Sequence, residues 1–133
     1  MTVELIRAAD LYGGAEYAYA AIASPGALVF TAGACPLDES GATVGVGDVR
    51  AQSRRCAANL VMALAASGAG LGDVLKTTVY VASAERTDLV AAWEEIRAAF
   101  GTHDAPSTLL GVAVLGYADQ LVELEAVALR PSA

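Results

Sequence analysis

Residues 105–128 read APSTLLGVAVLGYADQLVELEAVA, and this stretch holds the pattern that decides the fold. In its second half, apolar and acidic side chains alternate with a period of two, which is typical of a β-strand. Glu123 and Glu125 therefore project from one face, and the apolar residues around them project from the other, which we expect to face the core. The stretch contains no Lys or Arg. Because an unpaired buried carboxylate costs several kcal/mol, the two glutamates are expected at a solvated surface, a subunit interface or a pocket.

Working outward from this strand, the periodicity predicts the element order βββαβαββ. The expected strands cover residues 3–7, 17–22, 27–31, 76–81, 108–114 and 121–129. A turn at residues 24–26, Ser-Pro-Gly, is expected to join the second and third strands as a hairpin. A long amphipathic helix should begin at Asp48 as N-cap and end at Gly68, and a second should cover residues 88–100, capped by Thr87 or Asp88.

The order of the elements predicts one α/β domain over residues 1–133 with an incompletely covered sheet. Right-handed crossovers place both helices on one face of a six-stranded mixed sheet. The other face is then bare, and self-association into a closed ring would cover it. Only 17% of the residues are charged, against about 25% in an average soluble domain. We therefore expect a homo-oligomer.

The charge of the chain disfavours a nucleic-acid partner. Fifteen Asp and Glu against eight Lys and Arg give a net charge of −7, whereas a phosphate backbone is held mainly by clustered cations. The one basic cluster, Arg50, Arg54 and Arg55, falls on a predicted helix. Such a cluster is more typical of a solvated face or an interface.

The cysteines and the hydropathy of the chain indicate whether to expect disulfides, metal sites or membrane segments. Cys35 and Cys56 lie in different predicted elements without metal-ligand spacing, so we expect free thiols, no metal site and no cofactor. No segment reaches about 18 uninterrupted apolar residues, and no positively charged leader precedes an apolar run. We expect a soluble cytoplasmic protein that does not bind membranes.

Several segments together resemble the Rid (reactive intermediate deaminase, YjgF) family. They are Tyr19 with LVFTAG (28–33) before Pro36, KTTVYV (76–81), and AP (105–106) followed by VELEAVA (122–128). Their order and spacing match over residues 17–130. The resemblance implies a chorismate-mutase-like fold (α+β) and a homotrimer with three equivalent pockets between neighbouring subunits. Such an assembly agrees with the bare sheet face.

The resemblance also implies a candidate site. In the deaminase branch, an Arg two residues after the Pro of the penultimate strand holds the substrate carboxylate, and a Glu near the start of the final strand works with a water at the imine. Counted from Pro106, these positions are Thr108, whose neutral hydroxyl cannot replace a guanidinium, and Glu123. Glu123 is the candidate catalytic residue. The candidate substrate-binding residues are Tyr19, Ala32, Trp93, Thr108 and Leu110.

An apolar pocket with a carboxylate and no guanidinium suits a neutral or cationic ligand. We therefore expect a protein ancillary to a metabolic pathway that binds a small imine, enamine or carbonyl compound without a carboxylate, and that transforms it by acid/base chemistry through Glu123. Two alternatives stay open, so the sequence does not decide whether the protein is an enzyme. One is a non-catalytic metabolite-binding or regulatory trimer. The other is a 2-imino acid deaminase in which Arg7 or an arginine of residues 50–55 supplies the missing cation across the subunit interface. Glu123 could also be a strand carboxylate satisfied at the interface, and Glu125 is expected at the interface or in solvent.

Overall fold

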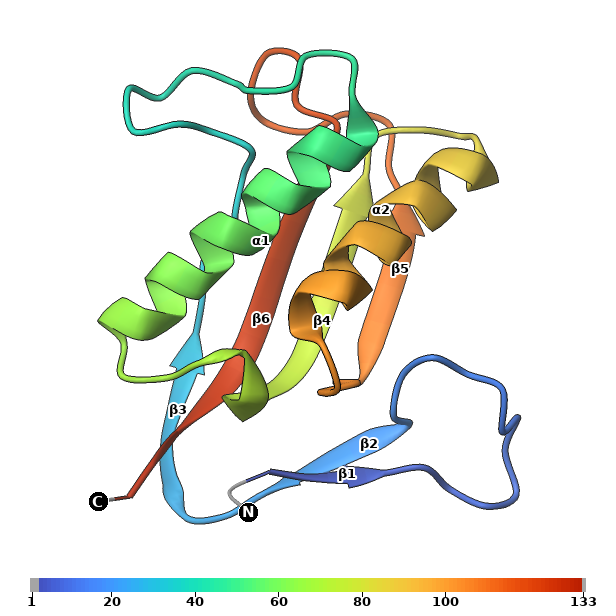
Figure 1. The fold of residues 1–133 in the computed structure, drawn as a ribbon, viewed down its shortest axis with the longest axis vertical. Coiled ribbons are helices and arrows are strands. Elements are labelled where there is room, and N and C mark those ends of the chain that lie inside the picture. The colour runs from blue at the N-terminus through green and yellow to red at the C-terminus, as the bar shows by residue number, and fades with distance from the viewer. Residues whose placement is uncertain (1–2, 133) are drawn as a thin grey trace.

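The computed structural model describes residues 3–132 and confirms a mixed fold of two helices and a mixed sheet. In chain order the elements are β1 (Val3–Ile6), β2 (Ala20–Ala23), β3 (Gly26–Phe30), α1 (Val49–Ala66), the short 3-10 helix η1 (Leu71–Asp73), β4 (Val74–Val81), α2 (Arg86–Phe100), β5 (Ser107–Gly111) and β6 (Val122–Pro131). The main sheet has the strand order β3-β6-β4-β5. Strand β6 runs antiparallel to β3 and β4, while β4 and β5 are parallel. Both helices cover the same face of this sheet (Figure 1).

The expected single six-stranded sheet is wrong, and so is the expected hairpin between the second and third strands. Strand β1 pairs with β2 in a separate two-stranded sheet, which lies beyond one end of the main sheet in Figure 1. Pro25, between β2 and β3, has no N–H to donate to a hairpin ladder. Strand β3 instead pairs along the ten-residue β6, from Gly26 opposite Pro131 to Phe30 opposite Val127.

The alternation in β6 is confirmed and defines the core. Val122 and Leu124 are fully buried at 0% exposure, whereas Glu123 and Glu125 on the opposite face are half-buried. The buried side packs against the inward face of α1, which includes Cys56, Leu60 and Leu64. Because this alternation assigns each β6 side chain to one face, it also places Glu123 away from the helices.

The helix termini follow the expected chemistry for α1 and differ for α2. The carboxylate of Asp48 accepts from the N–H of Ala51 at 2.9 Å, and Gly68 adopts a positive φ of 79° after the last turn of α1. Helix α2 begins at Arg86, earlier than expected, with Glu85 in the N-cap position. Asp88 is therefore no cap. Its carboxylate accepts from the hydroxyl of Ser83 at 2.7 Å from within the first helical turn, where negative charge is favourable.

The sheet face opposite the helices exposes large apolar side chains. Phe30 is 72% exposed and Leu110 is 43% exposed. Leu110 lies opposite Tyr80, and Tyr80 lies opposite Glu123, so these three side chains share one row of this open face. Within residues 3–132, neither helix combines the length and apolarity that a membrane crossing requires.

Candidate functional site

Glu123 is held by neutral donors. The Nε2 of Gln120 donates to its Oε1 at 3.1 Å, and the thiol of Cys35 donates to the same oxygen at 3.3 Å. Its Oε2 lies over Gly33, where a Cβ atom would collide with the carboxylate. The ion pairs found among residues 3–132 use other carboxylates, namely those of Glu16, Glu94, Glu95 and Asp104.

Glu125 has a different partner on the same face. The hydroxyl of Tyr80 donates to its Oε1 at 2.5 Å. This hydrogen bond is the main reason why the pKa of Tyr80 is raised above its ordinary value. Each glutamate of β6 is therefore satisfied by uncharged groups of its own chain.

A buried glutamine of α1 holds the turn that carries Gln120. The side chain of Gln52 has 0% exposure, and it donates to the carbonyl of Asp119 at 2.9 Å and accepts from the N–H of Leu121 at 2.7 Å. These two bonds bracket Gln120 in the chain. Asp119 has a positive φ of 61°, a conformation that Asp tolerates better than most residues. Helix α1 thus fixes the direction in which Gln120 points.

The same helix holds the segment that carries Cys35. The Nδ2 of Asn59 donates to the carbonyls of Cys35 at 2.8 Å and Leu37 at 3.0 Å, and the Nε of Arg55 donates to the carbonyl of Leu37 at 2.9 Å. Ala34 forms a bridge with Leu124. The segment after β3 therefore continues along β6 and brings Cys35 next to Glu123.

Both cysteines are free thiols, as expected. Burial, the hydrogen bond to Glu123 and the charge of Glu123 raise the pKa of Cys35 to about 11. Burial also raises the pKa of Cys56, which lies in the core. At neutral pH both side chains are thiols, and Cys35 is a hydrogen-bond donor.

A lysine that the sequence reasoning did not consider lies on the open face. The Nζ of Lys76 on β4 donates to the Oγ1 of Thr108 on β5 at 2.6 Å. The sequence analysis named arginines as possible replacement cations and did not consider this lysine, which lies thirty-two residues before Thr108 in the chain. The arginines named as replacements are engaged elsewhere in the chain. Arg7 pairs with Asp104, Arg50 and Arg54 pair with Glu95, and Arg55 bonds to Leu37.

Tyr19 and Trp93 lie together beside β5. The ring of Tyr17 stands between them, with centroids 5.6 Å from Tyr19 and 6.3 Å from Trp93. A groove of about 290 Å³ is lined there by Tyr17, Trp93, Ser107 and Leu109. Trp93 is half-buried at this edge and its Nε1 donates to Glu16 at 3.2 Å. Tyr19 precedes β2, and its hydroxyl donates to the carbonyl of Tyr12 at 2.8 Å.

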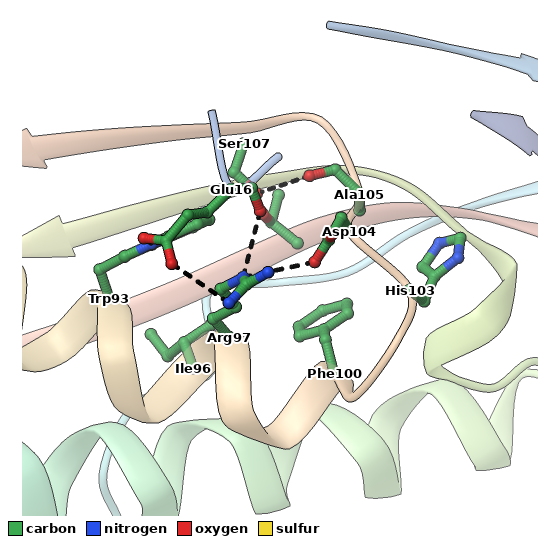
Figure 2. Close-up of a pocket in the computed structure, with 10 residues that line it drawn as sticks. Glu16, Trp93, Ile96, Arg97, Phe100, His103, Asp104, Ala105 and Ser107 are labelled. Carbon is green, nitrogen blue, oxygen red and sulfur yellow. Dashed lines mark hydrogen bonds and ion pairs between the residues drawn. The ribbon is translucent and has the colours of Figure 1, made fainter. Parts of the chain in front are cut away.

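A small cavity adjoins this groove behind Trp93. Figure 2 shows the Glu16 carboxylate pointing at Arg97, with Asp104 on the other side of the guanidinium. The nitrogen–oxygen distances are 3.1 Å to Glu16 and 3.4 Å to Asp104. The space enclosed here is about 10 Å³, enough for about one water molecule. The two carboxylates are balanced by Arg97 and by Arg7, which pairs with Asp104, so we assign this cavity a structural role.

The predicted site residues therefore fall into two groups within one chain. Ala32 is exposed next to Gly33, and Gly33 and Cys35 line a second groove, of about 350 Å³, together with Arg55 and Asn59 of α1. This groove lies on the β3 side of the sheet, whereas Tyr19 and Trp93 lie on the β5 side. Strands β3 and β5 are the two edges of the main sheet. Among residues 3–132, no group of three or more His, Cys, Asp or Glu is arranged to hold a metal ion.

Sequence reasoning missed the polar residues that build the Glu123 site. Gln120 is 4% exposed and Gln52 is 0% exposed, although glutamine is seldom so buried. The available signal was position. Gln52 and Asn59 lie seven residues apart, which places two amide side chains on one side of a helix. Lys76 gave no local signal, since its partner is thirty-two residues away.

Comparison with known proteins decides the family. A family model described as Endoribonuclease L-PSP matches residues 10–130. The chain belongs to this family, the Rid or YjgF family. One relative is a protein from Salmonella typhimurium named 2-iminobutanoate/2-iminopropanoate deaminase. It is 35% identical to this Rid chain over 108 residues, covering 79% of this chain and 81% of the relative.

Solved structures of Rid proteins confirm the fold. A Rid family protein of unknown function, YyfB from Yersinia pestis, superposes with a TM-score of 0.90 at 28% identity, covering 97% of this chain and 99% of that one. TdcF from E. coli, solved with bound serine, gives a TM-score of 0.69 at 28% identity, covering 98% and 99%. At equal identity, this Rid chain is thus more similar in shape to YyfB than to TdcF.

Proposed function

We propose that this Rid protein forms a homotrimer whose pockets lie between neighbouring chains, and that Glu123 acts there as an acid/base group on a small reactive imine, enamine or carbonyl compound without a carboxylate. The observation that carries the proposal is the environment of Glu123. Its carboxylate lies on an open sheet face, held by Gln120 and Cys35 instead of by a cation. Because no cation of the same chain pairs with this carboxylate, it can exchange a proton with a ligand or a water molecule.

The separation of the two groups of site residues supports the intersubunit pocket. Glu123 and Gly33 lie toward the β3 edge of the sheet, and Tyr19 and Trp93 lie beside the β5 edge. A ring of chains that covers the open face would bring the β5 edge of one chain toward the β3 side of the next. The groove beside Tyr17 and Trp93 would then supply an apolar wall of the pocket, and Glu123 would supply the reactive group.

The chemistry proposed for an imine is hydrolysis. Glu123 accepts a proton from a water molecule while the water oxygen bonds to the imine carbon, and the proton passes to the nitrogen. The product of this addition is a carbinolamine. Its hydroxyl proton then passes to the nitrogen as the carbon–nitrogen bond breaks, so that ammonia leaves and a carbonyl compound forms. Thr108 lacks the planar charged fork that would hold a carboxylate, which favours substrates without one as long as Lys76 stays bonded to Thr108.

The test uses two sets of imines generated in situ. Those made by an amine oxidase lack a carboxylate, and those made by an amino acid oxidase carry one. We expect faster release of ammonia from the first set only, and loss of this acceleration in the Glu123→Gln variant. Glu125→Gln is the matched control, because it changes the neighbouring carboxylate on the same face. Binding of neutral imines or amines without turnover would instead favour a metabolite-binding or regulatory trimer.

A second candidate is a deaminase of 2-imino acids, and one specific contact favours it. Lys76 places an ammonium group against Thr108, so a cation is available near the arginine position. The Salmonella relative is named for such an activity. Acceleration with amino-acid-derived imines that is lost in Lys76→Met would establish this candidate. Cleavage of RNA is disfavoured by the net charge of −7.

A further inference from the structure

The two oxygens of the Glu123 carboxylate have different surroundings. Both side-chain hydrogen bonds, from Gln120 at 3.1 Å and from Cys35 at 3.3 Å, end on Oε1. The Oε2 atom lies over the backbone of Gly33, in the space that any other residue would fill with its Cβ. Gly33 also lines the groove of about 350 Å³. The carboxylate is thus anchored through Oε1, while Oε2 lies against Gly33, a residue that lines this groove.

The amide of Gln120 has no freedom to turn away. Its Oε1 accepts from the N–H of Tyr117 at 3.0 Å, and its Nε2 also donates to the carbonyl of Val122 at 3.1 Å. Rotation of the amide by 180° would place its oxygen against the Val122 carbonyl and the Glu123 carboxylate, which are both acceptors. Since the side chain is 4% exposed, water cannot readily replace these partners.

The backbone around Cys35 is also fixed by hydrogen bonds. Its carbonyl accepts from Asn59 at 2.8 Å, and the neighbouring Ala34 pairs with Leu124 of β6 through bonds of 2.6 Å and 3.1 Å. The thiol is therefore placed by a backbone that is fixed on both sides. Because Glu123 and burial keep the thiol protonated, it can donate to the carboxylate throughout the neutral pH range.

We propose that Gln120 and Cys35 are positioning residues that hold Glu123 through Oε1, so that Oε2, over Gly33, is the oxygen that exchanges a proton with the ligand. This assignment rests on the proposed function of Glu123. The fixed amide of Gln120 and the fixed thiol of Cys35 take the place of a cation, so the carboxylate is oriented without being neutralised.

The first experiment tests the contact without any substrate. The rate of Cys35 alkylation by iodoacetamide is followed against pH by peptide mass spectrometry, which separates Cys35 from the buried Cys56. In Glu123→Gln the loss of the charge should lower the pKa of the Cys35 thiol, so that alkylation near pH 9 is about tenfold faster than in the wild type. Glu125→Gln should leave the rate unchanged. Equal rates in the wild type and Glu123→Gln would overturn the proposal.

The second experiment tests the positioning role. Crystal structures of Gln120→Met and Cys35→Ala should show the Glu123 carboxylate displaced or spread over several positions, whereas Cys35→Ser, which keeps a donor, should retain it. An unchanged carboxylate in Gln120→Met and in Cys35→Ala would contradict the assignment.

Turnover measurements separate this inference from the proposed function. With a substrate that Glu123 turns over, Gln120→Met and Cys35→Ala should lower kcat and move its pH profile, and Cys35→Ser should restore both. Unchanged profiles in these variants would reject the positioning role while leaving the function of Glu123 intact. An active Glu123→Gln variant would reject the proposed function, even if the thiol titration had shown the contact.

Discussion

The ammonium group of Lys76 lies 2.6 Å from the hydroxyl oxygen of Thr108, across the parallel pair of β4 and β5. The lysine therefore bonds to a neutral residue, although Glu123 and Glu125 lie on the same face. Both glutamates already have uncharged donors of their own. The open face thus keeps its positive and negative groups apart, and a ligand or a neighbouring chain can meet either one.

Thr108→Arg tests what the position of Thr108 contributes to specificity. A guanidinium at this site would offer a planar pair of charged donors beside Lys76, which suits a carboxylate. We expect kcat/KM for amino-acid-derived imines to rise by about 10- to 100-fold, in line with about 1.5–3 kcal/mol for hydrogen bonds to a charged group. Release of the 2-keto acid measures it. Thr108→Gln adds length without charge and should give no such gain, and an equal gain in both variants would argue against carboxylate recognition.

The proposed homotrimer can be tested by measuring the molecular mass of the protein in solution. We expect light scattering to give three times the 13.5 kDa of one chain. Phe30→Glu should dissociate the assembly, because Phe30 is 72% exposed on the face that the neighbours would cover. Val61→Glu is the control, since Val61 is also apolar and 43% exposed but lies on α1. A monomeric wild type would reject the intersubunit pocket.

Gln52→Leu tests the buried amide that holds the turn before β6. The change removes bonds to Asp119 and Leu121 and leaves their backbone groups without partners in a dry environment. We expect a loss of about 2–4 kcal/mol in the free energy of unfolding, measured by urea titration. Arg54→Gln, which breaks an exposed ion pair with Glu95 on the same helix, should change it little. Similar effects of both variants would contradict the role of Gln52.

Alkaline conditions should destabilise the protein through its thiols. The pKa of Cys35 is raised from 9.0 to about 11, so the folded chain retains this proton at a pH where the unfolded chain has lost it. Stability is therefore intact below about pH 9 and falls as the pH rises toward about 11. Urea titrations at several pH values measure the slope. Cys35→Ser should make it shallower, and a stability that is constant from pH 9 to 11 would be inconsistent with the raised pKa.

Strand β6 shows which structural features the local sequence pattern could predict. The period of two in residues 122–128 correctly placed Val122 and Leu124 in the core and Glu123 on the other face, since side-chain direction in a strand depends only on position along it. The pattern could not predict which strand would pair with which. The Ser-Pro-Gly turn suggested a hairpin, whereas β3 found its partner in β6, about a hundred residues away.

The candidate site shows the same division. Glu123 and Thr108 could be named as candidates from the resemblance to the Rid family. Cys35, Gln120 and Lys76 could not, because each acquires its role from a partner that only the fold brings near. A cysteine, a glutamine and a lysine carry no local signature of such a role.

The sequence by itself determined the class of fold and the two faces of β6, since these depend on residue type and periodicity. Its resemblance to the Rid family gave the family and placed Thr108 at the position of the family's arginine. The tertiary structure alone decided that Lys76 meets Thr108 and that α1, through Gln52 and Asn59, holds the two segments that anchor Glu123. The reason is physical. A hydrogen bond requires atoms within about 3 Å in the right direction, and contacts between residues far apart in the chain are set by how strands pair and how a helix packs on them.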